Sequence, residues 1–273
     1  MEESLRKYKA YLEDEEKSAA TMEKYLRDAR TFLIYINGSE ITKGEAIRYK
    51  EYLSQQYAPA SVNSMLVALN RYLRFIGKGD CCVKLLKIQR QMFCREEKEL
   101  TKEEYQKLVK ASEGTRLSFV LQTICGTGIR VSELRYITVE AVMQGKAVVN
   151  CKNKTRVIFI PAPLQKLLKQ YIKKSGLTTG SVFVSKNGKP LNRSNIWRDM
   201  KALCRKAGIA PGKVFPHNLR RLFARTFYGI EKDLVKLADI LGHANVNTTR
   251  IYTVESGDQH ASRMEKIQRL LTT

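Results

Sequence analysis

The sequence predicts a mainly α-helical protein in two parts, a helical bundle followed by a mixed α+β part with one small β-hairpin. Apolar residues recur at helical spacing along most of the 273 residues. A convincing strand pattern occurs once, where two β-rich runs flank a short turn at 147–160. The stretch 89–98 is polar, charged and aperiodic, so it predicts a linker between a helical domain at 1–88 and a second domain at 99–273.

Four helices are expected in the first domain. A short apolar stripe lies within Leu5–Leu12, and a clearer one begins at Thr21 as the capping residue and ends at Gly38. The third helix is expected from Thr42 to about Gln56. The fourth begins at Pro59 and stops at Gly77, because proline suits a helix start and glycine a helix end.

Arginines and lysines gather on the faces opposite these apolar stripes. Any single one of them is ordinarily a solvated surface residue, but the whole chain carries 49 Lys and Arg against 27 Asp and Glu, a net charge of +22. Such an excess indicates a polyanionic partner, and double-stranded DNA is the first candidate. The candidate DNA-backbone contacts are Arg27, Arg30, Lys43, Arg48, Arg71 and Arg74.

The second domain is expected to open on a capping box, with Thr101 and Glu104 at the start of a helix. The two strand runs, 147–150 and 156–160, predict a hairpin with lysines in its turn. Trp197 is expected in the core rather than at a stacking surface. Further helices are expected at Leu117–Ile124, Pro163–Lys174 and Ser194–Ala207.

Polar residues with a chemical role stand at the ends of these elements. In Gly126-Thr127-Gly128-Ile129-Arg130 the glycines allow a tight turn, and a helix start at Ser132-Glu133 would leave backbone N–H groups that favour an anion near Arg130. His217 and Arg220 are three residues apart, so they share one helix face. Each of these signals is weak when taken alone.

A last motif surrounds a histidine and a tyrosine. Gly242 follows an apolar helical run, so His243 stands just beyond a helix end. Asn247 and Thr248 are capping types that predict a short helix carrying Tyr252.

Taken together, these elements resemble the tyrosine recombinase/integrase family, of the phage-integrase type and with an Xer-like layout. The motifs that carry the resemblance are, in chain order, Gly-Thr-Gly-Ile-Arg130, a hairpin lysine, His217-x-x-Arg220, Leu-Gly-His243 and Tyr252. The resemblance covers nearly the whole chain. It implies a SAM-like core-binding domain at 1–88 and a catalytic domain from 99 onward.

The resemblance also implies a role for each residue. Arg130 and Arg220 would clamp the scissile phosphate, for which a planar fork of permanent donors is suited, and His243 would donate a further hydrogen bond. His217 would accept the proton of Tyr252, whose phenol has an ordinary pKa of about 10 and needs such neighbours to act as nucleophile. The product would be a 3′-phosphotyrosyl enzyme and a free 5′-hydroxyl.

The hairpin departs from the pattern. Family turns often carry Gly-Lys-Gly-Asn-Lys, whereas Cys151-Lys152-Asn153-Lys154 is one residue shorter and has no glycine. Lys152 is the expected general acid for the departing 5′-oxygen, with Lys154 as the alternative and as a further DNA contact. Arg221 stands where many relatives carry a second histidine, which we interpret as tolerated variation.

The function implied is site-specific recombination through a Holliday junction, by four protomers on paired DNA sites and a monomer when free. A type IB topoisomerase and a non-catalytic basic DNA-binding regulator are the alternatives. We expect no nucleotide cofactor, because the phosphotyrosyl link conserves the bond energy. We expect no metal, because six cysteines are scattered and three histidines are too few to complete a site. The polar start and the lack of a long apolar run predict a cytoplasmic protein without a membrane span.

The end of the chain predicts one more helix. Met264, Ile267, Leu270 and Leu271 recur at helical spacing after a polar, turn-prone stretch at 254–260. Such a stripe either folds back on its own domain or docks on a neighbouring protomer. We expect docking on the neighbour, as in the family that the chain resembles.

Overall fold

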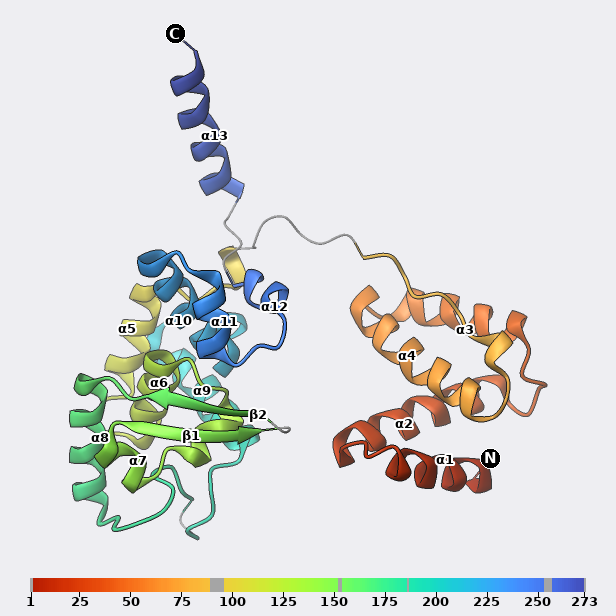
Figure 1. Cartoon of the computed structure of the whole chain (residues 1–273), viewed down its shortest axis with the longest axis horizontal. Coiled ribbons are helices and arrows are strands. Elements are labelled where there is room, and N and C mark those ends of the chain that lie inside the picture. Colours follow the sequence, from red (N-terminus) through yellow and green to blue (C-terminus); the bar gives the residue numbers. More distant parts are fainter. Residues whose placement is uncertain (1, 89–95, 152–153, 186, 253–256, 273) are drawn as a thin grey trace. The chain divides into compact units, whose positions relative to one another are not determined.

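The computed structural model describes residues 2–88, 96–151, 154–185, 187–252 and 257–272 (Figure 1). For Glu96, Cys151, Lys154, 257–260 and Arg263 only the backbone is described. The chain divides into two compact units, Met1–Arg90 and Gln91–Thr273. The described residues are mostly helical and contain one two-stranded sheet, which confirms the predicted fold class. The last three residues of the predicted linker form a short 3₁₀ turn, η2 (Glu96–Lys98).

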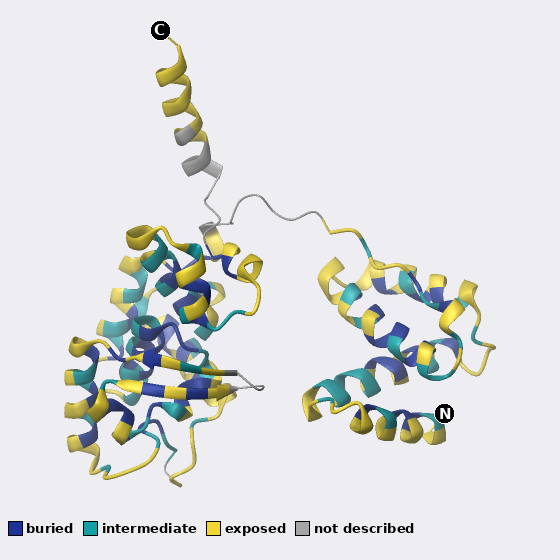
Figure 2. Ribbon diagram, viewed as in Figure 1, coloured by how far each residue is buried: buried dark blue, intermediate teal, exposed yellow. Residues whose placement is uncertain are grey.

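Unit 1 is a bundle of helices around an aromatic and aliphatic core. Its elements are α1 (Glu2–Asp14), α2 (Ala19–Ile36), α3 (Lys43–Gln56), α4 (Pro59–Phe75) and the 3₁₀ turn η1 (Gly79–Cys81). Tyr8, Phe32 and Leu66 are almost completely buried, and Figure 2 shows the buried faces turned toward the inside of the bundle. The second helix begins earlier than predicted: Ser18 caps it by accepting from the backbone N–H of Thr21.

Two asparagines of α4 hold the segment that follows it. Asn70 donates to the carbonyl of Val83 at 2.8 Å and accepts from its N–H at 2.9 Å. Asn63, two turns earlier on the same face, makes the same pair of bonds with Leu86. Each amide therefore replaces the partner that a neighbouring strand would provide for an extended backbone.

Unit 2 has a larger core formed by residues between Leu100 and Leu222, and a smaller cluster that contains Leu237, Leu241 and Tyr252. The buried side chains include Leu121, Ile124, Leu168, Met200 and Leu219. Its elements are α5 (Lys102–Ala111), α6 (Arg116–Thr127), η3 (Val131–Tyr136), α7 (Val139–Gln144), β1 (Lys146–Cys151), β2 (Lys154–Phe159), α8 (Ala162–Ser175), α9 (Arg193–Ala207), η4 (Pro211–Lys213), α10 (Pro216–Glu231), α11 (Leu234–Leu241), α12 (Val246–Arg250) and α13 (Gly257–Leu271).

Two sequence-based expectations about unit 2 need correction. The strands reach closer to the turn than predicted, since β1 and β2 pair antiparallel from Lys146–Phe159 to Cys151–Lys154. Trp197 is not in the core: its side chain is 51% exposed, because Ile196 and Met200 form the buried face of α9. The ammonium of Lys201 lies 5.3 Å from the centre of the indole ring.

The helices that carry the predicted site residues pack against one another. α10 packs on α6 and on α11, and α11 packs on α12 (Figure 1). α6 ends at Gly128 and α11 at Gly242, both in the left-handed conformation that glycine adopts without strain. A Cβ on Gly128 would overlap the ring of Phe223 on α10, so the absence of a side chain also lets α10 approach.

No helix among the described residues is long and apolar enough to cross a membrane.

Replacing Asn70 with alanine should lower the free energy of unfolding of unit 1 by about 2–4 kcal/mol, because two buried backbone groups of Val83 lose their partners. Urea unfolding of residues 1–90, followed by circular dichroism, measures this. Asn63→Ala is the matched control and should cost less, since its partners are only partly buried. A loss below about 1 kcal/mol for Asn70→Ala would contradict the role assigned to this pair.

Candidate active site

The predicted nucleophile lies at the end of the short helix α12. Tyr252 is 5% exposed, and its hydroxyl lies 3.3 Å from Nε2 of His217. Its backbone N–H donates to the carbonyl of Thr249 at 2.9 Å. The cap of this helix is Asn245, whose side chain accepts from the N–H of Asn247, so the prediction of a short helix holds but its start was placed too late.

His217 lies within hydrogen-bond distance of the tyrosine oxygen. It stands in the first turn of α10, just after Pro216 at the helix start. The pKa of His217 is lowered, first by burial and then by the positive charges of Arg220, Arg221 and Arg130. A lowered pKa keeps the imidazole unprotonated near neutral pH, so Nε2 can accept a proton from the tyrosine.

Arg220 is the most deeply buried charged residue of this cluster, with only 2% of its surface exposed. Its guanidinium donates to the carbonyl of Gly128 at 2.6 Å and to that of Leu241 at 2.7 Å. A third contact, at 2.9 Å, joins its Nη2 to Nε2 of His243. Burial, followed by the charge of Arg130, lowers its pKa to about 10, so it stays charged at neutral pH.

His243 lies between two neighbours. Its Nε2 faces Arg220, and its Nδ1 lies 2.8 Å from the hydroxyl of Thr249. Burial, and then the charges of Arg220 and Arg130, lower the pKa of His243 to about 4. The imidazole ring also lies against the ring of Tyr252, with 5.6 Å between the ring centres.

Arg130 sits where the turn after α6 meets η3. One of the backbone N–H groups at this turn, that of Arg130, is already bound, because the Glu133 carboxylate accepts it at 2.7 Å. The same carboxylate pairs with the Arg130 guanidinium at 3.0 Å. This guanidinium also donates to the carbonyl of Gly242 at 3.4 Å, and its side chain remains 41% exposed. The anion at this turn is therefore the carboxylate of Glu133, and part of the Arg130 side chain stays accessible to solvent.

The sequence reasoning missed Arg156 as part of this network. Its guanidinium donates to Glu133 at 2.7 Å and to the carbonyl of Leu241 at 2.7 Å. A Cβ on Gly242 would overlap this guanidinium. The alternation of side chains along a strand could have indicated this position. Arg156 is two residues before the buried Ile158 and four before the buried Ile160, so all three side chains lie on the same face.

The structure thus brings five of the six predicted catalytic residues into one network: Arg130, His217, Arg220, His243 and Tyr252. Lys152 lies outside the described residues, and the side chain of Lys154 is not described. Glu133 and Thr249 were not predicted as parts of the site, and they contact it directly.

Arg221 faces a different partner. It pairs with the buried carboxylate of Glu99 at 2.6 Å, and Arg225, one turn later, pairs with the same carboxylate. Asn218 donates to the carbonyl of Lys98 at 2.7 Å. These contacts fasten the first described residues of unit 2 to α10, the helix that carries His217 and Arg220.

Five of the six basic residues predicted to contact DNA in unit 1 make contacts within that unit. Three of the four salt bridges among them are exposed or partly exposed, and such pairs contribute at most about 1 kcal/mol each, so their groups can exchange partners readily. In the fourth, an exposed arginine pairs with the buried carboxylate of Asp28. The pairs are Arg27–Asp28, Arg30–Glu2, Arg48–Glu45 and Arg71–Glu15, and Lys43 donates to the carbonyl of Cys82. Arg74 is exposed on α4. Their role toward DNA stays a prediction.

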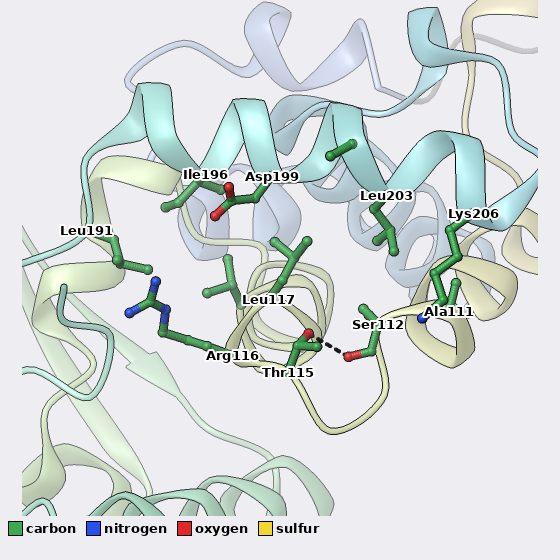
Figure 3. A pocket seen from close by; sticks show the side chains of 12 residues that line it. Ala111, Ser112, Thr115, Arg116, Leu117, Leu191, Ile196, Asp199, Leu203 and Lys206 are labelled. Atoms are coloured by element: carbon green, nitrogen blue, oxygen red, sulfur yellow. Dashed lines mark hydrogen bonds between the residues drawn. The ribbon is translucent and has the colours of Figure 1, made fainter. Parts of the chain in front are cut away.

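A separate cavity of about 460 Å³ lies between α6 and α9. Figure 3 shows Leu117 and Leu203 facing it, with Arg116 and Asp199 at its edge. None of the described side chains that line it belongs to the network around Tyr252. The described residues also contain no group of three or more His, Cys, Asp and Glu arranged to hold a metal ion.

Comparison with known proteins identifies the family. The model of the phage integrase family matches residues 98–258. The tyrosine recombinase XerA of Pyrococcus furiosus is 33% identical over 92% of this chain and 89% of the relative. The chain belongs to the phage integrase family. XerA of Thermococcus kodakarensis is 28% identical over 97% of this chain and 95% of the relative.

Solved structures of the family share the fold. A crystal structure of XerA recombinase matches with a TM-score of 0.55 at 27% identity, over 98% of both chains. A lambda integrase dimer bound to a core site matches with a TM-score of 0.76 at 18% identity, over 94% of this chain and 96% of that one. The predicted family and enzyme class, a tyrosine site-specific recombinase, are confirmed, and the topoisomerase and the regulator are not favoured.

The lowered pKa of His243 predicts an acid-sensitive fold. An unfolded histidine has a pKa of about 6.5, whereas that of folded His243 is about 4. Between these values the unfolded chain binds a proton that the folded chain does not, so stability is complete above about pH 6.5 and is lost as the pH falls toward 4.

An NMR titration of the imidazole in the full-length chain should give a pKa for His243 near 4, and His243→Gln should remove this part of the acid sensitivity. A value near 6.5 would mean that the imidazole is not held in the buried, positively charged environment seen here.

Proposed function

We propose that this phage integrase family member cleaves and rejoins duplex DNA by attack of the Tyr252 hydroxyl on a backbone phosphate. The reaction would leave a 3′-phosphotyrosyl enzyme and a 5′-hydroxyl. The observation that carries the proposal is the convergence of Tyr252 and His217 with two arginines and His243. A nucleophile, a proton acceptor and several cationic or hydrogen-bonding groups are the parts that phosphoryl transfer at tyrosine requires.

Each group has a distinct task in this proposal. His217 takes the proton of Tyr252, for which its lowered pKa and the 3.3 Å contact suit it. Arg130 offers its open face to one non-bridging oxygen. Three N–H bonds of Arg220 are directed at Gly128, Leu241 and His243, so it binds phosphate through its remaining N–H groups or by releasing His243. Lys152 is proposed as the acid that protonates the leaving 5′-oxygen, with Lys154 as the alternative.

Duplex DNA is the proposed substrate, and we propose that both units take part in binding it. The net charge of +22 and the basic faces of unit 1 suit a DNA backbone. We assign core binding to residues 1–88 and catalysis to 99–273. Because the substrate is DNA, we also place the protein in the cytoplasm.

Assembly on paired sites is the second part of the proposal. One structural relative is a lambda integrase tetramer bound to a Holliday junction, which supports four protomers and strand exchange for this chain. The apolar side chains of α13, Met264, Ile267, Leu270 and Leu271, are all exposed in the single chain. They offer a surface for contact with a second protomer.

Tyr252→Phe should abolish covalent complexes with a nicked suicide substrate while duplex affinity changes little, because only the attacking oxygen is removed. Denaturing gels measure the complexes and gel shifts measure the affinity. Tyr171→Phe, a tyrosine on α8 outside the network, should form complexes at the parent rate. A detergent-resistant adduct with Tyr252→Phe would show that another residue is the nucleophile.

Arg130→Ala and Arg220→Ala should each slow cleavage by about 100- to 1,000-fold, because one positioned donor to the transition state is worth about 3–4 kcal/mol. Single-turnover cleavage of the nicked substrate measures the rate. Arg116→Ala is the control, since Arg116 donates to the carbonyl of Val184 outside the network. A loss of less than tenfold would remove either arginine from the phosphate clamp.

Removing residues 1–90 should weaken duplex binding by about 100-fold or more, because the phosphate contacts of unit 1 are lost. The binding constant should also depend less on salt. The slope of its logarithm against the logarithm of the salt concentration should become shallower by about 0.9 for each lost phosphate contact. Fluorescence anisotropy at several salt concentrations tests both. Equal slopes for the fragment and the full chain would show that the basic residues of unit 1 do not contact DNA.

A further inference from the structure

Thr249 occupies an unusual place for a threonine. It is completely buried on α12, three residues before Tyr252. Its carbonyl accepts the N–H of Tyr252, and its hydroxyl lies 2.8 Å from Nδ1 of His243. One side chain therefore joins the helix that carries the nucleophile to a histidine of the phosphate site.

The partners of His243 determine where its ring proton lies. A guanidinium only donates hydrogen bonds, so Nε2 of His243 must accept from Arg220. A neutral imidazole carries a single N–H, which is then on Nδ1 and donates to the Thr249 hydroxyl. The reverse tautomer would direct the N–H of His243 against an N–H of Arg220. The lowered pKa of His243 agrees with a neutral ring.

We propose that Thr249 is a positioning residue: its hydroxyl accepts the Nδ1–H that Arg220 imposes on His243, and this bond holds the ring with Nε2 directed at the phosphate site. The consequence for the reaction rests on the proposed function. In the free protein His243 has no proton on Nε2 to donate, contrary to the simple donor role expected from the sequence. It becomes a donor to phosphate when Nε2 gains a proton.

The Thr249 hydroxyl is suited to both protonation states. Nδ1 carries a proton in the neutral tautomer inferred above and also in the imidazolium, so the hydroxyl oxygen accepts in both. A bound phosphate would favour the imidazolium, because a nearby negative charge raises the pKa of a histidine. The ring thus stays in place, and stays connected to the helix of Tyr252, while its charge changes.

The experiment reads the tautomer directly. Long-range ¹⁵N–¹H correlation spectra of the full-length chain, labelled at its three histidines, distinguish Nδ1–H from Nε2–H rings. Comparison with His243→Gln assigns the signals. The parent chain should show His243 as Nδ1–H, and Thr249→Ser should keep this pattern. Thr249→Val removes the acceptor of that proton, so the Nδ1–H resonance should shift upfield and broaden through faster exchange with water. Thr248→Val, at the exposed neighbouring position, is the matched control and should resemble the parent.

A rate measurement completes the test. Thr249→Val should slow covalent complex formation about tenfold or more, the effect of losing one buried hydrogen bond in the site. Thr249→Ser should restore most of the rate, and duplex affinity should be the same for both. The spectra do not depend on cleavage, so they stand even if Tyr252 proves not to be the nucleophile. A parent chain with His243 as Nε2–H, or an Nδ1–H resonance with unchanged shift and exchange rate in a folded Thr249→Val chain, would overturn the proposal.

Discussion

The buried guanidinium of Arg220 is the interaction on which the site depends. A charge removed from water is costly unless its donors are satisfied. Here the carbonyls of Gly128 and Leu241 satisfy them, at 2.6 and 2.7 Å. Both carbonyls lie at helix C-termini, of α6 and α11, where the helix dipole is negative. Burying one cation on α10 therefore requires two other helices to end beside it, and this brings together the residues of the proposed phosphate site.

The second constraint is an imbalance of charge. Arg130, Arg156 and Arg220 lie close together, and the buried carboxylate of Glu133 pairs with the first two of them. The excess positive charge lowers the pKa of Arg220 and of His243, after the larger effect of burial. A phosphate placed among these groups would relieve their mutual repulsion, so the free site is electrostatically prepared for an anion.

The two units handle charge in different ways. In unit 1, pairs such as Arg30–Glu2 lie at the surface and are weak, so they compete little with a DNA backbone. In unit 2 the charges around the proposed phosphate site have buried partners, Glu133 and the carbonyls of Gly128 and Leu241, which hold their geometry in the free protein. This division suits loose tracking of a polyanion by one part and accurate alignment of one phosphate by the other.

The sequence by itself predicted most of the helices, the single hairpin, the family and five residues that the structure brings together, because these depend on local periodicity, caps and motifs in chain order. It could not place Arg156 or Thr249 in the site, since their partners, Leu241 and His243, are chosen by how helices pack. It also could not reveal that Nε2 of His243 faces the guanidinium of Arg220 while Nδ1 faces the hydroxyl of Thr249. The position of a ring proton depends on which donors and acceptors face the ring, and only the tertiary structure decides that.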